Sequence, residues 1–222
     1  MIIIKNDNEV SLMRKAGKIV GETLLLLENE IKPGITTAEL DKIAEEFITK
    51  HGAKPSFKGL YGFPSSLCIS VNEQVIHGIP GEYMLKDGDI VSIDCGACID
   101  GFHGDAARTF PVGNISSDAQ KLIDITKESF FKGIEYAKVG NKLGDVSHEI
   151  QSYVEAAGFS VVRDFVGHGI GANVHEDPNV PNFGKAGIGP DLVKGMVLAI
   201  EPMVNIVQLT FDFLSVYPLQ LK

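Results

Sequence analysis

The sequence predicts an α/β fold of two similar halves, in which an antiparallel sheet is covered by helices. Helical and strand-like segments alternate along the 222 residues. The glycines that end corresponding helices are equally spaced, since Gly34 and Gly140 are 106 residues apart, as are Gly52 and Gly158. A fixed spacing of this kind indicates a duplicated structural unit. A long hairpin signature over residues 89–110 adds the antiparallel pairing.

The first half begins with a short expected strand and two helices. Helical periodicity over residues 7–31 starts at Asp7, a typical N-cap residue, and ends at a Lys-Pro-Gly turn. Thr36 and Glu39 then form a capping-box signature for a second helix that continues to about Lys50.

The second half repeats this plan. Ser116 or Ser117 is expected to cap a helix that ends at residues 138–140. A further helix is expected from about Gly144 to Ala157, stopping at a glycine in the C′ position.

The hairpin places two carboxylates on one face of the predicted sheet. Asp100-Gly101 is a two-residue turn signature, so residues whose numbers sum to 201 face each other across the strands. Asp94 then faces Ala107, and Asp105 lies two positions from Ala107. Diagonal neighbours of this kind are roughly 7–8 Å apart at the backbone. The pair suits two metals about 3.5–4 Å apart, although two solvated hairpin aspartates are the plainer interpretation.

Two further segments favour the metal interpretation. His168 lies in GHGIG (167–171) and Glu201 in VLAIEPM (197–203). Each segment is expected as a strand that is apolar apart from one residue of a ligand type. A buried charge must be paired or bound to a metal. Adding the repeat spacing to Asp94 gives Ile200, beside Glu201. The sequence therefore predicts a divalent metal site formed by Asp94, Asp105, His168 and Glu201 from both halves.

Composition excludes several other functions. A chain of this length with 44% hydrophobic residues can bury one full core. The net charge of −9 and the lack of a basic run make nucleic acid a poor partner. No apolar run reaches the roughly 18 residues of a membrane span. Three cysteines and no secretory leader favour the cytoplasm with reduced thiols. Cys95 and Cys98 lack a second pair for zinc and are expected as small core residues.

Four motifs together resemble the type I methionine aminopeptidases. They are PSSLCISVNEQVIHGIP (64–80), SIDCGACIDGFHGDAARTF (92–110), GHGIGANVHEDPNVPNFG (167–184) and VKGMVLAIEPMVN (193–205). The resemblance covers residues 1–205, expected as one domain. It implies the pita-bread fold, removal of the initiator methionine from nascent chains by a cytoplasmic monomer, and two divalent ions of the cobalt, manganese, iron, zinc or nickel class. It leaves ribosome association open.

The resemblance also implies roles for individual residues. Glu201 would ligate metal and take a proton from water, and His175 would donate to the scissile carbonyl as it becomes an oxyanion. His77 would contact the substrate amide. Cys68 and Phe63 would line the methionine pocket, where a soft apolar wall suits a thioether. Without the motifs, the histidines are typical loop residues and the other two are typical core residues.

The end of the sequence departs from the family pattern. Family members continue past Asn205 into another sheet segment with a last glutamate that bridges both metals. Segment 206–222 contains no glutamate, only Asp212, and the chain has no tryptophan to cover the pocket. We therefore expect an incomplete last sheet segment and one tightly bound ion, because one carboxylate fewer leaves fewer ligands per ion.

Two alternatives stay open from the sequence. One is a proline dipeptidase-like enzyme of the same fold, whose longer N-terminal domain has no counterpart here. The other is a catalytically impaired or non-catalytic peptide-binding relative, which the unmatched 206–222 segment favours.

Overall fold

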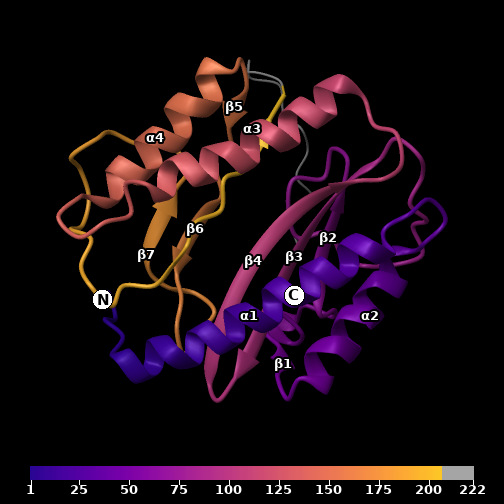
Figure 1. The fold of residues 1–222 in the computed structure, drawn as a ribbon, viewed down its shortest axis with the longest axis horizontal. Coiled ribbons are helices and arrows are strands. Elements are labelled where there is room, and N and C mark those ends of the chain that lie inside the picture. Colours follow the sequence, from indigo (N-terminus) through magenta and orange to yellow (C-terminus); the bar gives the residue numbers. More distant parts are fainter. Residues whose placement is uncertain (207–222) are drawn as a thin grey trace.

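A computed structural model describes residues 1–206, so most of segment 206–222, with Asp212, lies outside the described residues. The described chain forms two halves, each with a pair of helices beside its own strands (Figure 1). The elements of the first half are α1 (Asp7–Glu30), α2 (Thr37–Lys50), β1 (Lys54–Pro55), the 3₁₀ turn η1 (Leu60–Gly62), β2 (Leu67–Val71), β3 (Ile90–Ile99) and β4 (Phe102–Pro111). Those of the second half are α3 (Ser117–Ile134), α4 (Leu143–Ala156), β5 (Ser160–Val161), β6 (Val166–Gly169), β7 (Glu176–Pro181), β8 (Leu198–Ala199) and β9 (Val204–Asn205).

The N-terminus of α1 differs from the sequence prediction. Asn6, and not Asp7, is the N-cap, because its side chain accepts the backbone N–H groups of Asn8 and Glu9. The Glu9 side chain in turn accepts the Asn6 N–H and completes a capping box. The strand expected before this helix is also wrong. Residues 1–6 form no strand. A backbone bond from Lys5 N–H to Gly195 O at 2.8 Å and an ion pair between Lys5 and Glu176 hold this segment instead.

Helix α3 starts as predicted and ends early. Ser116 is the N-cap and accepts the N–H of Ala119. The helix stops at Ile134, short of the expected end at residues 138–140. Beyond it, Tyr136 N–H donates to Gly133 O and Ala137 N–H to Ile134 O, so the chain tightens into i→i+3 turns.

Hydrogen bonds confirm that the two halves repeat one unit. In the first half, Leu85 N–H donates to Ile35 O at 2.9 Å, and in the second Leu192 N–H donates to Asn141 O at the same distance. A capping box opens α2. At the start of α4, Asp145 likewise accepts the backbone N–H of the N-cap residue, Lys142. The four spaced glycines all have positive φ, from 74° to 98°. Only glycine adopts this backbone without strain, which explains why the sequence spacing reports the repeat.

The first sheet carries the predicted hairpin. Strand β3 is its centre, with β4 along one edge and β2 and β1 along the other. The β3–β4 register runs from Ile90 opposite Pro111 to Ile99 opposite Phe102, and Asp94 faces Ala107 as predicted. Asp100, at the turn, has φ 53° and is followed by Gly101 with φ 83°. These values fit the primed turns that favour Asp-Gly.

The main core lies between this sheet and helices α1 and α2. It contains fully buried residues of both helices, such as Leu27 and Ile48, and of β3, such as Ile93 and Cys95. Cys95 is thus a core residue as predicted, whereas Cys98 is only half-buried. The two helices therefore cover the face of the hairpin that carries these core residues.

The second half has shorter strands than the sequence suggested. Strands β7, β6 and β8 form one sheet, and β5 pairs with β9 in another. The apolar segment 197–203 was expected as a full strand, but β8 pairs only Leu198 and Ala199 with β6. Glu201 therefore follows a strand and does not lie within one. No helix in residues 1–206 is long and apolar enough to cross a membrane.

Candidate active site

The structure brings the four predicted metal ligands together from both halves. Asp94 comes from β3 and Asp105 from the adjacent strand β4, where they are diagonal neighbours because Asp105 faces Gly96. His168 comes from β6, and Glu201 follows β8. The predicted convergence of the hairpin with the late apolar segments is therefore present in the fold.

Glycines allow the second half to reach the hairpin. A Cβ on Gly167 would lie 2.3 Å from Ala199 O, and a Cβ on Gly169 would lie 2.1 Å from Asp177 O. Real Cβ atoms do not approach so closely, so any side chain would push β6 away from its neighbours. His168 stands between these two glycines and pairs with Ala199 of β8. The GHGIG pattern thus fixes His168 by close backbone approach.

The ligand atoms form a compact group. His168 Nε2 lies 3.1 Å from Glu201 Oε1 and 3.6 Å from Asp105 Oδ2. One ligand atom from each of these three residues lies within 4.8 Å of the others. Asp94 adjoins the group through contact between its carboxyl and that of Asp105. Two carboxylates and one imidazole thus converge on one position, and the Asp94 carboxyl lies beside them.

Electrostatics show that these carboxylates are crowded. Burial, followed by the charges of Asp105 and Glu201, raises the pKa of Asp94 well above its ordinary value. Burial and then Glu201 raise the pKa of Asp105 to about 7. Burial alone lowers the pKa of His168, but the carboxylates around it outweigh burial and raise it. Among residues 1–206 no lysine or arginine forms an ion pair with these carboxylates.

This donor set fits a divalent cation. Carboxylate oxygens and an imidazole nitrogen are ligands that borderline and hard divalent ions accept. Glu201 Oε1 is buried and has no hydrogen-bond partner of acceptable geometry among the described residues, despite lying near His168. A buried acceptor without a donor is costly, and a cation would stabilise it. His168 Nδ1 lies 2.9 Å from Gly169 O, which leaves Nε2 for a ligand role.

His175 lies against this group. Its ring centroid is 4.5 Å from that of His168, at an interplanar angle of 74°. The exposed ring of Tyr61 also stacks on His175, at 6.0 Å between centroids. Burial, and then the neighbouring His168, lower the pKa of His175. A neutral imidazole held beside the carboxylates can donate one hydrogen bond to a bound group.

His77 is positioned by a close backbone contact between the next residue, Gly78, and strand β2. Gly78 N–H donates to Ser70 Oγ at 3.1 Å, and Ile69 N–H donates to Gly78 O at 2.8 Å. A Cβ on Gly78 would lie 2.0 Å from Ile69 O, so glycine is required there. His77 itself is exposed, with φ 57°, and its ring meets Phe165 edge-on at 6.1 Å.

The two predicted pocket residues share one apolar cluster. Cys68 is buried and Phe63 half-buried in a group that also contains Phe57, Leu60 and Val174. Val174 directly precedes His175, so this apolar wall adjoins the polar site. Burial, followed by the charge of Asp94, raises the pKa of the Cys68 thiol, which keeps it neutral.

Several neighbours of the site were not predicted from the sequence. Phe57, Val174 and Phe165 are single apolar residues of the kind that usually packs in a core, so nothing in the sequence marked them as part of the site. Tyr61 lies between two glycines of positive φ and itself has φ 49°. The glycines at positions 59 and 62 were the one available signal that a turn presents this ring.

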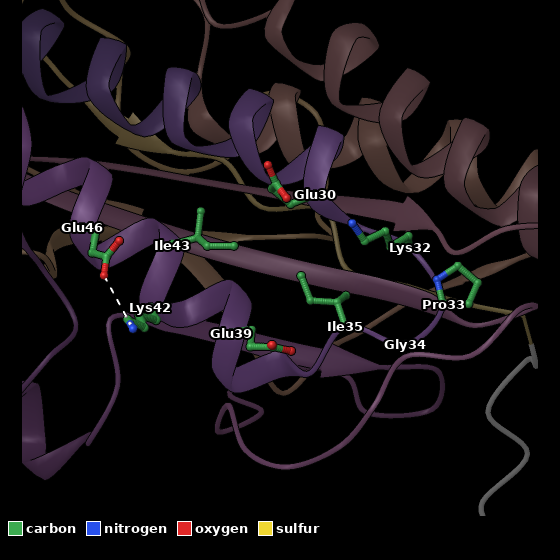
Figure 2. A pocket seen from close by; sticks show the side chains of 9 residues that line it. All are labelled: Glu30, Lys32, Pro33, Gly34, Ile35, Glu39, Lys42, Ile43 and Glu46. Atoms are coloured by element: carbon green, nitrogen blue, oxygen red, sulfur yellow. Dashed lines mark ion pairs between the residues drawn. The ribbon is translucent and has the colours of Figure 1, made fainter.

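A surface pocket of about 590 Å³ lies elsewhere, between the end of α1 and helix α2 (Figure 2). None of its lining residues is a predicted site residue. Its charged side chains include Glu46, which pairs with Lys42 at 3.9 Å. The residues that line this pocket include no histidine and no cluster of ligand atoms, so they offer no metal site.

Comparison with known proteins identifies relatives. The sequence pattern of metallopeptidase family M24 matches residues 11–214. The methionine aminopeptidase of Clostridium perfringens is 77% identical over 205 residues, which are 92% of this chain and 82% of that protein.

Solved structures agree with that match. The crystal structure of methionine aminopeptidase from Rickettsia prowazekii has a TM-score of 0.94 and 42% identity, over 98% of this chain and 88% of that one. The Xaa-Pro dipeptidase from Bacillus anthracis has a TM-score of 0.77 and 25% identity, and the match covers 90% of this chain but 54% of that one. These likenesses confirm the pita-bread fold.

Proposed function

We propose that this chain, which belongs to metallopeptidase family M24 and to its methionine aminopeptidases, removes the N-terminal methionine from nascent proteins. One observation supports this most strongly: Asp94, Asp105, His168 and Glu201 converge beside His175, next to an apolar wall. A metal-activated hydrolytic site and a pocket for an unbranched apolar side chain are thereby adjacent.

Asp105, His168 and Glu201 would hold one divalent ion, and Asp94 with Asp105 would share a second. The clustered triad offers three ligand types within a short distance, whereas the second position depends mainly on two carboxylates. When bound, a divalent ion lowers the pKa of a coordinated water from 15.7 towards about 7. We expect the first ion to bind more tightly than the second.

Glu201 is the general base in this proposal. Its carboxylate is half-buried, and its Oε1 has no hydrogen-bond donor of its own among the described residues. It can therefore accept the proton of the attacking water and later pass it to the leaving amine. The other carboxylates are deeper and crowded, so they are better suited to holding charge than to exchanging protons.

His175 and His77 act on the peptide bond. His175 lies beside the ligand group and has a lowered pKa, so the neutral ring can donate to the carbonyl oxygen as it gains negative charge. His77 is exposed and near enough to influence the pKa of His175. It can contact the amide of the residue that follows methionine and so orient the scissile bond.

The apolar cluster supplies the methionine pocket. Cys68 and Phe63 pack with Phe57 and with Val174, which directly precedes His175. A thioether chain is flexible and polarisable, so sulfur and aromatic surfaces bind it favourably. Because the Cys68 thiol stays protonated, it contributes packing and not a charge.

The test is methionine release from a Met-Gly-Xaa peptide by the full chain with manganese or cobalt. We expect release that a chelator abolishes and that added metal restores. Matched assays with Xaa-Pro dipeptides distinguish the dipeptidase alternative. Metal binding and peptide binding without turnover on either substrate would instead identify a non-catalytic peptide-binding protein.

A further inference from the structure

We propose that a buried ion pair between Lys5 and Glu176 holds the loop that presents His175, which makes both of them positioning residues. This inference rests on the proposed role of His175 in catalysis. Lys5 Nζ lies 2.5 Å from Glu176 Oε2, and the two side chains are only 2% and 3% exposed. Charged side chains are almost never buried so completely unless they are paired.

The burial of this pair calls for a reason other than stability. Removing two charges from water offsets much of their attraction, so a buried pair is a poor stabilising device. Buried pairs can instead select one arrangement of the chain. Glu176 directly follows His175, so the arrangement selected here is that of the proposed oxyanion donor.

The remaining contacts of Glu176 fix the loop from inside. Glu176 Oε1 accepts the backbone N–H of Asn173 at 3.1 Å. The N–H of Gly171 donates to Asn173 O at 3.0 Å, and Gly171 O accepts the N–H of His103 at 2.9 Å. His103 lies on β4, two residues before Asp105. The loop is thus tied to the metal-binding strand at one end and to Lys5 at the other.

The space around the pair is fitted to it. A Cβ on Gly171 would lie 2.5 Å from Lys5 Cε and 2.6 Å from Glu176 Oε1. Lys5 Nζ also donates to Ile3 O at 3.0 Å, which satisfies a second ammonium proton. The Lys5 side chain is therefore held in one position, with Gly171 of the loop packed directly against it.

Lys5 also joins a second part of the site. Its backbone N–H donates to Gly195 O, and a Cβ on Gly195 would lie 2.5 Å from Lys5 O. Gly195 begins the segment that leads through β8 to Glu201. One residue of the N-terminal segment thereby contacts the chain leading to the proposed base and the loop holding the proposed donor.

The main experiment compares Glu176→Gln and Lys5→Met with His175→Ala. A misplacement of about 1 Å can lower a rate by about 10²-fold. We expect each positioning variant to lower kcat about 10–100-fold, less than the loss of the donor itself. KM for the peptide and the calorimetric affinity for manganese should change less than about twofold. Lys142→Met, which removes a surface ion pair with Asp191 at 2.6 Å, should leave kcat unchanged.

A double-mutant cycle separates positioning from general damage. If Glu176 acts through His175, adding Glu176→Gln to His175→Ala should lower kcat by less than about twofold, because residues acting as a unit are not additive. A full additional loss would overturn the proposal. Since Glu176→Gln leaves Lys5 buried and unpaired, the neutral pair Lys5→Met with Glu176→Gln serves as a second variant where the single change fails to fold.

A readout without turnover distinguishes this proposal from the proposed function. Amide hydrogen exchange over residues 171–177 should become at least about tenfold faster in Glu176→Gln, with exchange in the β3–β4 hairpin unchanged. An inactive wild-type protein would defeat the proposed function while this measurement still tested the clamp. Unchanged exchange in the loop would overturn the positioning role whatever the activity.

Discussion

The two halves of the molecule supply their ligands in different ways. In the first half, Asp94 and Asp105 lie inside two long strands paired without interruption. In the second half, His168 lies in a four-residue strand and Glu201 follows a two-residue strand. The first half fixes its carboxylates by sheet register. The second fixes its ligands by close backbone contacts at glycines.

This difference means that the two halves should resist displacement of their ligands to different degrees. A register shared by many residue pairs resists displacement, because a slip of one residue would turn every side chain to the other face. Short strands have few pairs and depend on the space that glycine leaves. We therefore expect the hairpin to keep its carboxylates in place, and the ligands of the second half to be displaced more easily by substitutions.

The largest effect is expected at the second half's carboxylate. Glu201→Gln should lower methionine release by about 10²–10⁴-fold or more, because it removes both the proposed base and a ligand charge while preserving volume. A steady-state peptide assay measures this. Glu46→Gln, on the exposed face of α2, removes an equivalent surface charge and should have no effect. Unchanged turnover in Glu201→Gln would refute the base assignment.

His175→Ala should have the next largest effect. We expect kcat to fall about 10²–10³-fold, the usual cost of removing one oxyanion donor, with little change in KM. The exposed His51, whose Nδ1 lies 2.8 Å from Phe47 O, provides His51→Ala as the matched control. A rise in KM alone would make His175 a binding residue.

Glycine substitutions test the comparison between the halves directly. Gly167→Ala should destabilise the protein by about 1–3 kcal/mol, as overpacking does, and should weaken metal binding by displacing His168. Gly21→Ala, in α1, meets no atom within 4 Å. It should raise stability by about 0.5–1 kcal/mol, because glycine is a poor helix residue. Urea unfolding of both variants measures the difference, and equal stabilities would contradict the close-contact argument.

A smaller effect concerns pH and the hairpin carboxylates. Burial, and then Glu201, raise the pKa of Asp105 to about 7 in the folded state, against about 3.9 in an unfolded chain. Between these values the folded, metal-free protein retains a proton that the unfolded chain releases. Its free energy of unfolding should therefore fall as pH rises from about 4 to about 7.

Chelator-treated protein unfolded in urea at several pH values tests this dependence. Asp105→Asn should weaken this dependence, because the substituted side chain does not titrate. The part that remains comes from Asp94, whose pKa burial also raises. Added manganese should reverse the loss near pH 7, since the ion binds the folded state. A stability that rises over this range in the metal-free protein would contradict the crowding of the carboxylates.

The fold of the first half could be predicted from the sequence more fully than that of the second half. The β3–β4 register and the facing of Asp94 and Ala107 could be predicted because a two-residue turn leaves only one pairing. The repeat could be predicted because αL positions demand glycine. The short length of β8 and the end of α3 at Ile134 could not, because tertiary contacts and not local propensity set them.

Site residues could be predicted where a charged or ligand-type side chain stands in an apolar segment. Contacts between residues far apart in the sequence could not be predicted. His168 and Glu201 stood out because apolar segments seldom contain such residues. Their convergence with the hairpin needed the fold. The Lys5–Glu176 pair joins residues 171 positions apart, and neither has a sequence context that indicates the other. The N-cap of α1 was predicted as Asp7 and is Asn6. Asn and Asp are similarly strong N-caps, so the sequence could not rank two adjacent residues of these types.

Calorimetric titration with manganese of the wild-type chain, Asp94→Asn and His168→Ala tests most directly how the two halves contribute to the metal site. If both halves build one metal centre, the wild type should bind one ion tightly and a second more weakly. His168→Ala should lose the tight site, because it removes one member of the clustered triad. Asp94→Asn should weaken chiefly the second site. Tight binding that survives in His168→Ala would show that His168 is not a ligand of the tight site and would contradict its place in the clustered triad.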